Sequence, residues 1–170
     1  NSGSIVWQSA TNDTVARIYA SYNSGAENLA IETSGTERMI LDDNSRISLS
    51  NNDAGTDNTV FGFLAGASLG SGHDRNVLIG DYAGTNVAAD SNVLIGRACG
   101  DAITSGASNV AIGDSALGTA DTALQNIAIG GDAMSAIPTS TAVDSCVAIG
   151  VNALKGAAGT TTGANYTVAV

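Results

Sequence analysis

A short segment that recurs six times constrains this chain more than any other feature of its sequence. Each copy has a polar or small first residue, β-branched or aromatic residues at its second and fourth positions, and a final glycine. The six copies are Asn58–Gly62, Asn76–Gly80, Asn92–Gly96, Asn109–Gly113, Asn126–Gly130 and Cys146–Gly150, and a seventh, incomplete copy is Thr167–Val170. Their glycines follow one another at intervals of 16 to 20 residues. Recurrence at this period is typical of a solenoid, in which each repeat forms one rung.

Each element of the segment has a physical interpretation. Val110 and Ile112 are two residues apart, so they lie on one face of a short strand. Gly113, directly after the strand, suits a sharp corner that needs a positive φ or a close approach of two backbones. Asn109 and the other first-position asparagines could stack as a ladder of amide hydrogen bonds. They could equally be simple turn residues.

A second column of small residues accompanies the first. Three residues after each repeat glycine the chain carries Ala65, Ala83, Cys99, Ala116, Ala133 and Ala153. This column predicts a second short strand in each repeat, packed too closely for a large side chain. Cys99 is then a small buried residue in an alanine position. Cys146 occupies the asparagine column.

The middle residue of each predicted strand carries information about assembly. These residues are Val60, Leu78, Leu94, Ala111, Ala128, Ala148 and Ala169, and none is polar. A strand with one solvated face would alternate apolar and polar residues. We therefore expect both faces to be buried, one inside the protomer and the other against a second copy of the chain. The pattern leaves open which face is which.

The first 57 residues lack the repeat. Alternating residues and turn signals predict short strands over Ile5–Gln8, Val15–Tyr22, Asn28–Thr33, Arg38–Leu41 and Arg46–Leu49. We interpret residues 1–57 as a small β module that precedes or caps the solenoid of residues 58–170, with the boundary near the polar run Asn51–Asp57. The predicted fold class is all-β: a trimeric parallel β-solenoid or β-roll after a small β module, with almost no helix.

Composition excludes several functions. The chain of 170 residues has 16 acidic and 6 basic residues, a formal charge of −10. Such a balance argues against nucleic-acid binding and against an anionic membrane surface. No apolar run is long enough to cross a bilayer, so membrane insertion is not expected. Two cysteines give neither a disulfide framework nor metal-ligand spacing.

Candidate catalytic and metal-binding residues are weak. His73, the only histidine, lies in a predicted loop without a nucleophile motif nearby. Asp42–Asn44, Asp53 and Asp57 lack the ligand spacing of a calcium loop and are interpreted as turns. Scattered carboxylates leave glycoside cleavage open, but Trp7 is the only tryptophan, so few aromatic residues could stack on sugar rings. We predict no enzyme activity, no cofactor, no metal site and no catalytic residue.

The repeats from residue 58 to 170 resemble the head repeats of trimeric autotransporter adhesins, the YadA-like head. In those proteins a left-handed parallel β-roll assembles as a trimer. Similar repeats with longer and more variable spacing occur in bacteriophage tail fibres, often before a self-cleaving chaperone domain. The segments Arg17–Tyr22 and Leu29–Met39 are similar to upstream parts of such fibres. The spacing of 16 to 20 residues favours the fibre over the adhesin head, and the incomplete seventh repeat predicts that further fibre follows Val170.

The resemblance implies a structural component of a homotrimeric phage tail fibre, located in the virion, that serves as shaft and contacts a host receptor. The implied partners are two further copies of the chain and a host-cell surface glycan or protein. The alternative is the head of a bacterial trimeric surface adhesin, located at the cell surface. A glycan-cleaving tailspike is a remote alternative. The sequence does not assign receptor-binding residues.

Overall fold

The structure is a computed structural model, and it describes residues 4–8, 14–23, 26–33, 36–41, 47–49, 57–119, 121–136, 143–156 and 167–170. These residues form strands and turns without any helix, as the sequence predicted. The chain divides into two compact units, Asn1–Asn52 and Asp53–Val170. Each unit has its own sheet.

The first unit is an antiparallel sheet of five strands in chain order. They are β1 (Ser4–Gln8), β2 (Thr14–Asn23), β3 (Ala26–Thr33), β4 (Thr36–Leu41) and β5 (Ile47–Leu49). All five strands were predicted, and the alternation of polar and apolar residues located them to within two residues. The register aligns Ile5, Ile18, Ile31 and Met39 as direct cross-strand partners across β1 to β4.

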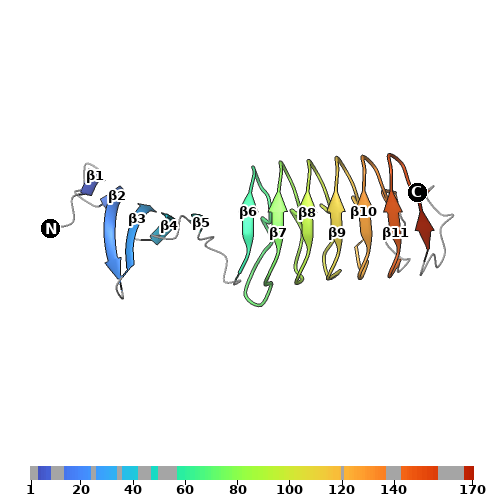
Figure 1. Ribbon diagram of the computed structural model, residues 1–170, viewed down its shortest axis with the longest axis horizontal. Helices are drawn as coiled ribbons and strands as arrows, with labels where there is room; N and C mark the ends of the chain where they lie inside the picture. The colour runs from blue at the N-terminus through green and yellow to red at the C-terminus, as the bar shows by residue number, and fades with distance from the viewer. Residues whose placement is uncertain are drawn as a thin grey trace. The chain divides into compact units, whose positions relative to one another are not determined.

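The second unit is a parallel β-solenoid of about six turns, with one short strand from each repeat (Figure 1). Its strands are β6 (Thr59–Phe61), β7 (Val77–Ile79), β8 (Val93–Ile95), β9 (Val110–Ile112), β10 (Ile127–Ile129), β11 (Val147–Ile149) and β12 (Val168–Ala169). Every strand pairs with its neighbours without a shift, so Val77 lies beside Val93 and Val93 beside Val110. Equivalent residues of successive repeats therefore form straight columns.

The middle residue of each strand points into the solenoid. Leu78, Leu94, Ala111, Ala128 and Ala148 are fully buried and belong to one continuous core. Because successive side chains of a strand point to opposite faces, the β-branched residues on either side of them face outward. The face of each strand that carries the middle residue is therefore the inner one, and the face that carries the β-branched residues is the outer one.

The asparagine column forms a hydrogen-bonded ladder. Asn109 is representative: its backbone N–H and its Nδ2 both donate to Asn92 Oδ1, each over 3.1 Å. Nδ2 also donates to the carbonyl of Ala123 at 2.8 Å, which ties the strand to the loop that leads into the next rung. Asn76, Asn92 and Asn126 repeat the pattern, and all four side chains are completely buried. The ladder, rather than the simple turn, is the main role of these residues.

The repeat glycines form the corners. Each has a φ between 127° and 146°. A Cβ at Gly80 would lie 2.5 Å from the carbonyl oxygen of Gly96, and a Cβ at Gly96 would lie 2.4 Å from that of Gly113. Both reasons for a glycine, a positive φ and a close approach of backbones, therefore apply at the corners from Gly62 to Gly130, whereas Gly150 has the positive φ alone.

The predicted second strand is absent from the described repeats. Ala83, Cys99, Ala116 and Ala133 are buried as expected, but they lie in turns. The residues on either side of Cys99, Ala98 and Gly100, have φ of 49° and 59°. Left-handed residues at alternate positions bend the backbone away from an extended conformation, so no strand can form there. The size of the side chain was predicted correctly, and the backbone conformation was not.

Many of the left-handed residues are not glycine. The residue before each repeat segment is one example, and these residues are Asp57, Arg75, Ser91, Ser108, Gln125 and Ser145, with φ between 58° and 62°. This conformation costs an L-residue about 1–2 kcal/mol. Here the N–H of Ser91 donates to the carbonyl of Asp74 one rung earlier, and Ser108 donates in the same way to Asp90. These bonds between rungs offset the strain.

Candidate assembly interface

The outward residues of β6 to β12 form one continuous apolar surface, which we call the outer face. Its members form two columns. The first column is Thr59, Val77, Val93, Val110, Ile127, Val147 and Val168, and the second is Phe61, Ile79, Ile95, Ile112, Ile129 and Ile149. None of these side chains is charged, and Thr59 is the only one with a polar group.

The outer face is only partly covered by the protomer itself. Ile112 and Ile127 are each 37% exposed and Ile149 is 42% exposed, whereas the middle residues behind them are fully buried. Contiguous exposed apolar surfaces on soluble proteins often mark interaction sites. The outer face therefore has the character of an interface rather than of a solvated sheet surface.

Charged residues border the outer face at both ends of the strands. Before the strands, Arg75 pairs with Asp90 at 2.9 Å. After the strands, Arg97 pairs with Asp114 at 2.7 Å. All four of these side chains are more than a third exposed, so each pair contributes little to the free energy of folding. An apolar centre with a polar rim is the usual anatomy of a protein–protein interface.

His73 stabilises a loop through hydrogen bonds of its side chain and its backbone. Its Nδ1 accepts a hydrogen bond from the backbone N–H of Gly70 at 3.0 Å, and its carbonyl accepts one from Asn58 Nδ2 at 2.8 Å. The half-buried ring therefore closes the loop that precedes Asn76. No hydroxyl or thiol nucleophile is within hydrogen-bond distance of His73 among the contacts of the described residues.

The two cysteines are buried in the stack. Burial raises the pKa of the Cys99 thiol from 9.0 to about 12, so Cys99 stays neutral at physiological pH. The backbone N–H of Cys146 donates to Asn126 Oδ1 at 2.9 Å, as the N–H of an asparagine in this column does. Its Sγ accepts a longer bond from Thr167 N at 3.4 Å. Neither cysteine forms a disulfide bond among the described residues.

Metal binding finds no support in the described part of the chain, where no group of three His, Cys, Asp or Glu side chains is close enough to hold an ion. Asp57 lies in an exposed turn with a φ of 61°. Asp42–Asn44 and Asp53 lie outside the described residues. Among the described segments there is also no helix with the length and apolar character needed to cross a membrane.

Comparison with protein-family models, with curated proteins and with solved structures finds no match to this chain. The proposed function therefore rests on the geometry of the chain itself. That geometry defines a class of protein: a parallel β-solenoid with a filled core and a partly exposed apolar sheet face.

The sequence revealed the columns of equivalent residues, but it did not reveal the left-handed residues or the exposure of the outer face. The left-handed columns are occupied by residues as different as Arg75, Tyr82 and Gln125. None of these residue types favours a positive φ, so only their fixed distance from the repeat segment could have revealed them. The exposed state of the outer face also required the structure, because Val and Ile on a strand are usually interior residues.

Proposed function

We propose that this chain is part of the shaft of a homotrimeric fibre, a bacteriophage tail fibre located in the virion, in which the outer faces of three solenoids pack against one another. The observation that carries this proposal is the outer face, a charge-free double column of β-branched and aromatic residues that the protomer leaves partly exposed. A second copy of the chain is the simplest partner, because its outer face has the same length, the same rung spacing and the same lack of charge.

The proposed role is mechanical and multivalent. Inter-rung hydrogen bonds fix each solenoid along its length, and the loops between the strands differ in length from rung to rung. Three copies would hold three sets of these loops at fixed relative positions. Weak contacts with a host-cell glycan or protein would then add through avidity. We propose no catalytic step.

The irregular rung length favours a tail fibre over the head of a bacterial adhesin, which is the alternative. The corner glycines are 16 residues apart between Gly80 and Gly96 but 20 apart between Gly130 and Gly150. The gene that encodes this chain offers a direct test. A chaperone domain encoded downstream supports the fibre, whereas a coiled coil and a membrane barrel would contradict it. Turnover of host polysaccharide by the purified protein would contradict the purely structural role.

The assembly is tested by native mass spectrometry of the chain and of two variants. The chain itself is expected at three times its own mass at micromolar concentration. Ile112→Lys places a charge in the centre of the outer face and is expected to abolish the trimer, because burying an unpaired ammonium is costly. Thr122→Lys, in an exposed loop, is the matched control and is expected to stay trimeric.

Circular dichroism checks that both variants keep their strands, since Ile112 is more than a third exposed in the protomer and its replacement need not disturb the core. A stable, folded monomer of the unmodified chain would contradict the proposed assembly. So would a trimer that Ile112→Lys leaves intact.

A further inference from the structure

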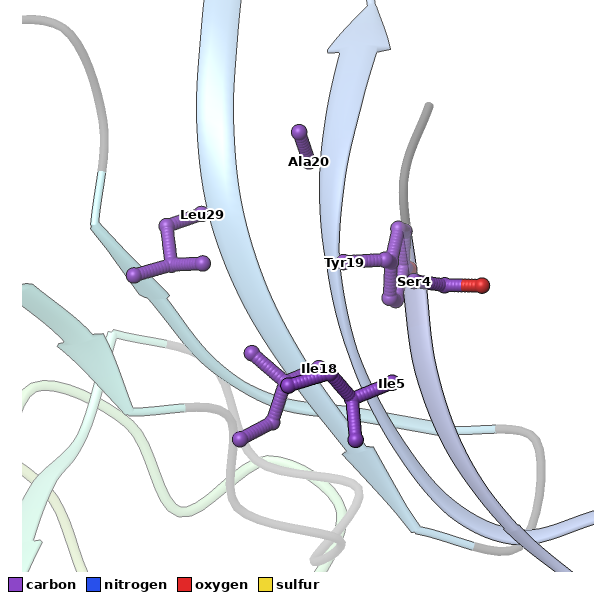
Figure 2. Close-up of a pocket in the computed structure, with 6 residues that line it drawn as sticks. All are labelled: Ser4, Ile5, Ile18, Tyr19, Ala20 and Leu29. Carbon is purple, nitrogen blue, oxygen red and sulfur yellow. The ribbon is translucent and has the colours of Figure 1, made fainter. Parts of the chain in front are cut away.

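The N-terminal sheet also has an apolar face, separate from the outer face of the solenoid. Its register makes Ile5, Ile18, Ile31 and Met39 direct neighbours across four strands, and pairs Ala20 with Leu29 on the same side. We call these six residues the N-terminal apolar face. Figure 2 shows Ile5 and Ile18 side by side, with Leu29 on the adjacent strand, around a shallow hollow.

On the opposite side of this sheet, polar and aromatic side chains cover strands β2 and β3. Arg17 pairs with Glu32 at 2.5 Å, and the Glu32 side chain is only 5% exposed. The Arg17 guanidinium also lies 4.4 Å from the centre of the Tyr19 ring, a cation–π distance. Ala30 is fully buried on this side. The polar layer over β2 and β3 therefore covers its own face of the sheet.

Within the described part of the chain, two residues of the N-terminal apolar face are largely exposed. Ile5 is 62% exposed and Leu29 is 50% exposed. The described strands of this unit belong to one sheet, so they provide no second layer. A sheet that is apolar on one face normally buries that face against another element.

We propose that the N-terminal apolar face packs against the same face of the other copies in the assembly, forming a second self-association surface. This inference rests on the proposed trimer of solenoids. Eight peptide units separate Leu49 from Asp57, and they can span at most about 28 Å. Three sheets tethered this closely would have an effective concentration in the millimolar range.

A second copy fits this face better than a different protein does. Its described side chains are aliphatic or thioether groups and offer a partner no charge or hydrogen bond to recognise. Partners selected from solution gain specificity from such groups. Tethered copies need no recognition step, because the chain itself brings identical faces together.

The test uses the full chain with one added cysteine. Cys99→Ala and Cys146→Asn first remove the native thiols, and each replacement is the residue that other rungs carry in that column. Ile5→Cys then places a thiol on the N-terminal apolar face. Val6→Cys, the next residue on the same strand, places it on the opposite face and is the matched control, being 44% exposed. Circular dichroism confirms that both variants fold.

Two readouts follow: the rate of labelling by a fluorescent maleimide, and covalent dimers formed by a short bismaleimide on a denaturing gel. We expect Ile5→Cys to label about tenfold more slowly than Val6→Cys, because it reacts only when the interface opens. We also expect Ile5→Cys to give covalent dimers at protein concentrations where Val6→Cys gives none.

The outcomes separate this inference from the proposed assembly, because native mass is measured on the same samples. A trimer in which Ile5→Cys labels as fast as Val6→Cys overturns the inference and leaves the solenoid assembly standing. A trimer in which Ile5→Cys is protected but not cross-linked also overturns it, since another segment then covers the face. A monomer overturns the assembly itself.

Discussion

Gly100 lies directly against the side chain of Leu94 in the solenoid core: a Cβ at Gly100 would be 2.7 Å from Leu94 Cδ1. Gly84 has the same relation to Leu78, at 2.9 Å from its Cδ2. In the later rungs the strand residue becomes alanine, and the glycine column becomes Leu117, Met134 and Leu154. We infer that the column of middle strand residues and the column of Gly84 and Gly100 compensate each other in side-chain volume. Where one column has a small residue, the other has a large one that fills the same space.

This compensation predicts a rescue by double substitution. Leu94→Ala is expected to cost about 2–5 kcal/mol through a cavity, and Gly100→Leu alone should overpack the same space. The double variant copies the rung of Ala111 and Leu117, so its loss should be smaller than the sum by about 1–3 kcal/mol. Denaturant unfolding at one protein concentration measures the three free energies. Additive losses would contradict the compensation.

Asn109 is predicted to be among the most sensitive positions of the ladder. Asn109→Ala removes the donor to the Ala123 carbonyl and leaves the N–H of Asn126, which donates to Asn109 Oδ1 at 3.0 Å, without an acceptor. Buried unsatisfied groups cost about 1–3 kcal/mol each, so a total loss of about 3–5 kcal/mol is expected in thermal or chemical unfolding.

The control for that variant is Asn86→Ala. Asn86 also donates from Nδ2 to a backbone carbonyl, that of Asp101 at 2.8 Å, but its side chain is exposed. Water can replace this bond, so the change should stay within about 0.5 kcal/mol. Equal losses for the two variants would show that burial of the ladder contributes nothing.

The corner glycines should not tolerate a methyl group. Gly96→Ala places a Cβ 2.4 Å from the carbonyl oxygen of Gly113, and the obstacle is backbone that cannot rotate away. We expect a loss of more than about 3 kcal/mol. Gly72→Ala is the comparison: its φ is 82°, but a Cβ there meets nothing within 4 Å, so only conformational strain of about 1–2 kcal/mol is expected. Thermal unfolding of both variants at one concentration distinguishes contact from strain.

Cys99 should make the fold sensitive to alkaline pH. Burial raises the pKa of its thiol from 9.0 to about 12, so the folded protein keeps the proton that the unfolded chain releases near pH 9. The contribution of this group is complete below pH 9 and is lost as pH rises toward 12, by about 1.4 kcal/mol per unit. The free energy of unfolding should therefore fall by about 2 kcal/mol between about pH 8 and pH 10.5. Cys99→Ala should lack this part of the fall, and identical pH profiles would refute the assignment.

The sequence predicted the fold well where residue type and conformation are tightly linked. Val110 and Ile112 alternate with a small residue, and Gly113 follows, so strand and corner could be located from the order of residue types alone. The five N-terminal strands were predicted for the same reason. The turn around Cys99 was not, because Ala98 takes a left-handed φ that alanine does not favour, and the bonds that stabilise it come from neighbouring rungs.

The candidate interface was only partly predictable. The apolar character of both strand faces was visible in Ala111 and its neighbours, and it led to the expectation of a second copy. Which face remains exposed depends on how the turns fold back over the strand, a long-range property. The N-terminal apolar face depends in the same way on the register between β2 and β3, and residue types within the two strands do not specify that register.

Cys146 has a mechanical consequence for the column. From Asn76 to Asn126, each asparagine of the ladder bonds through its side-chain amide to the rung before it and to the rung after it. Cys146 has no amide, and its Sγ accepts a longer bond from Thr167 N at 3.4 Å. A solenoid pulled along its axis should therefore come apart first between Cys146 and Thr167, and the rungs before it should keep their shape. One cysteine in place of an asparagine would then determine where a fibre yields under load.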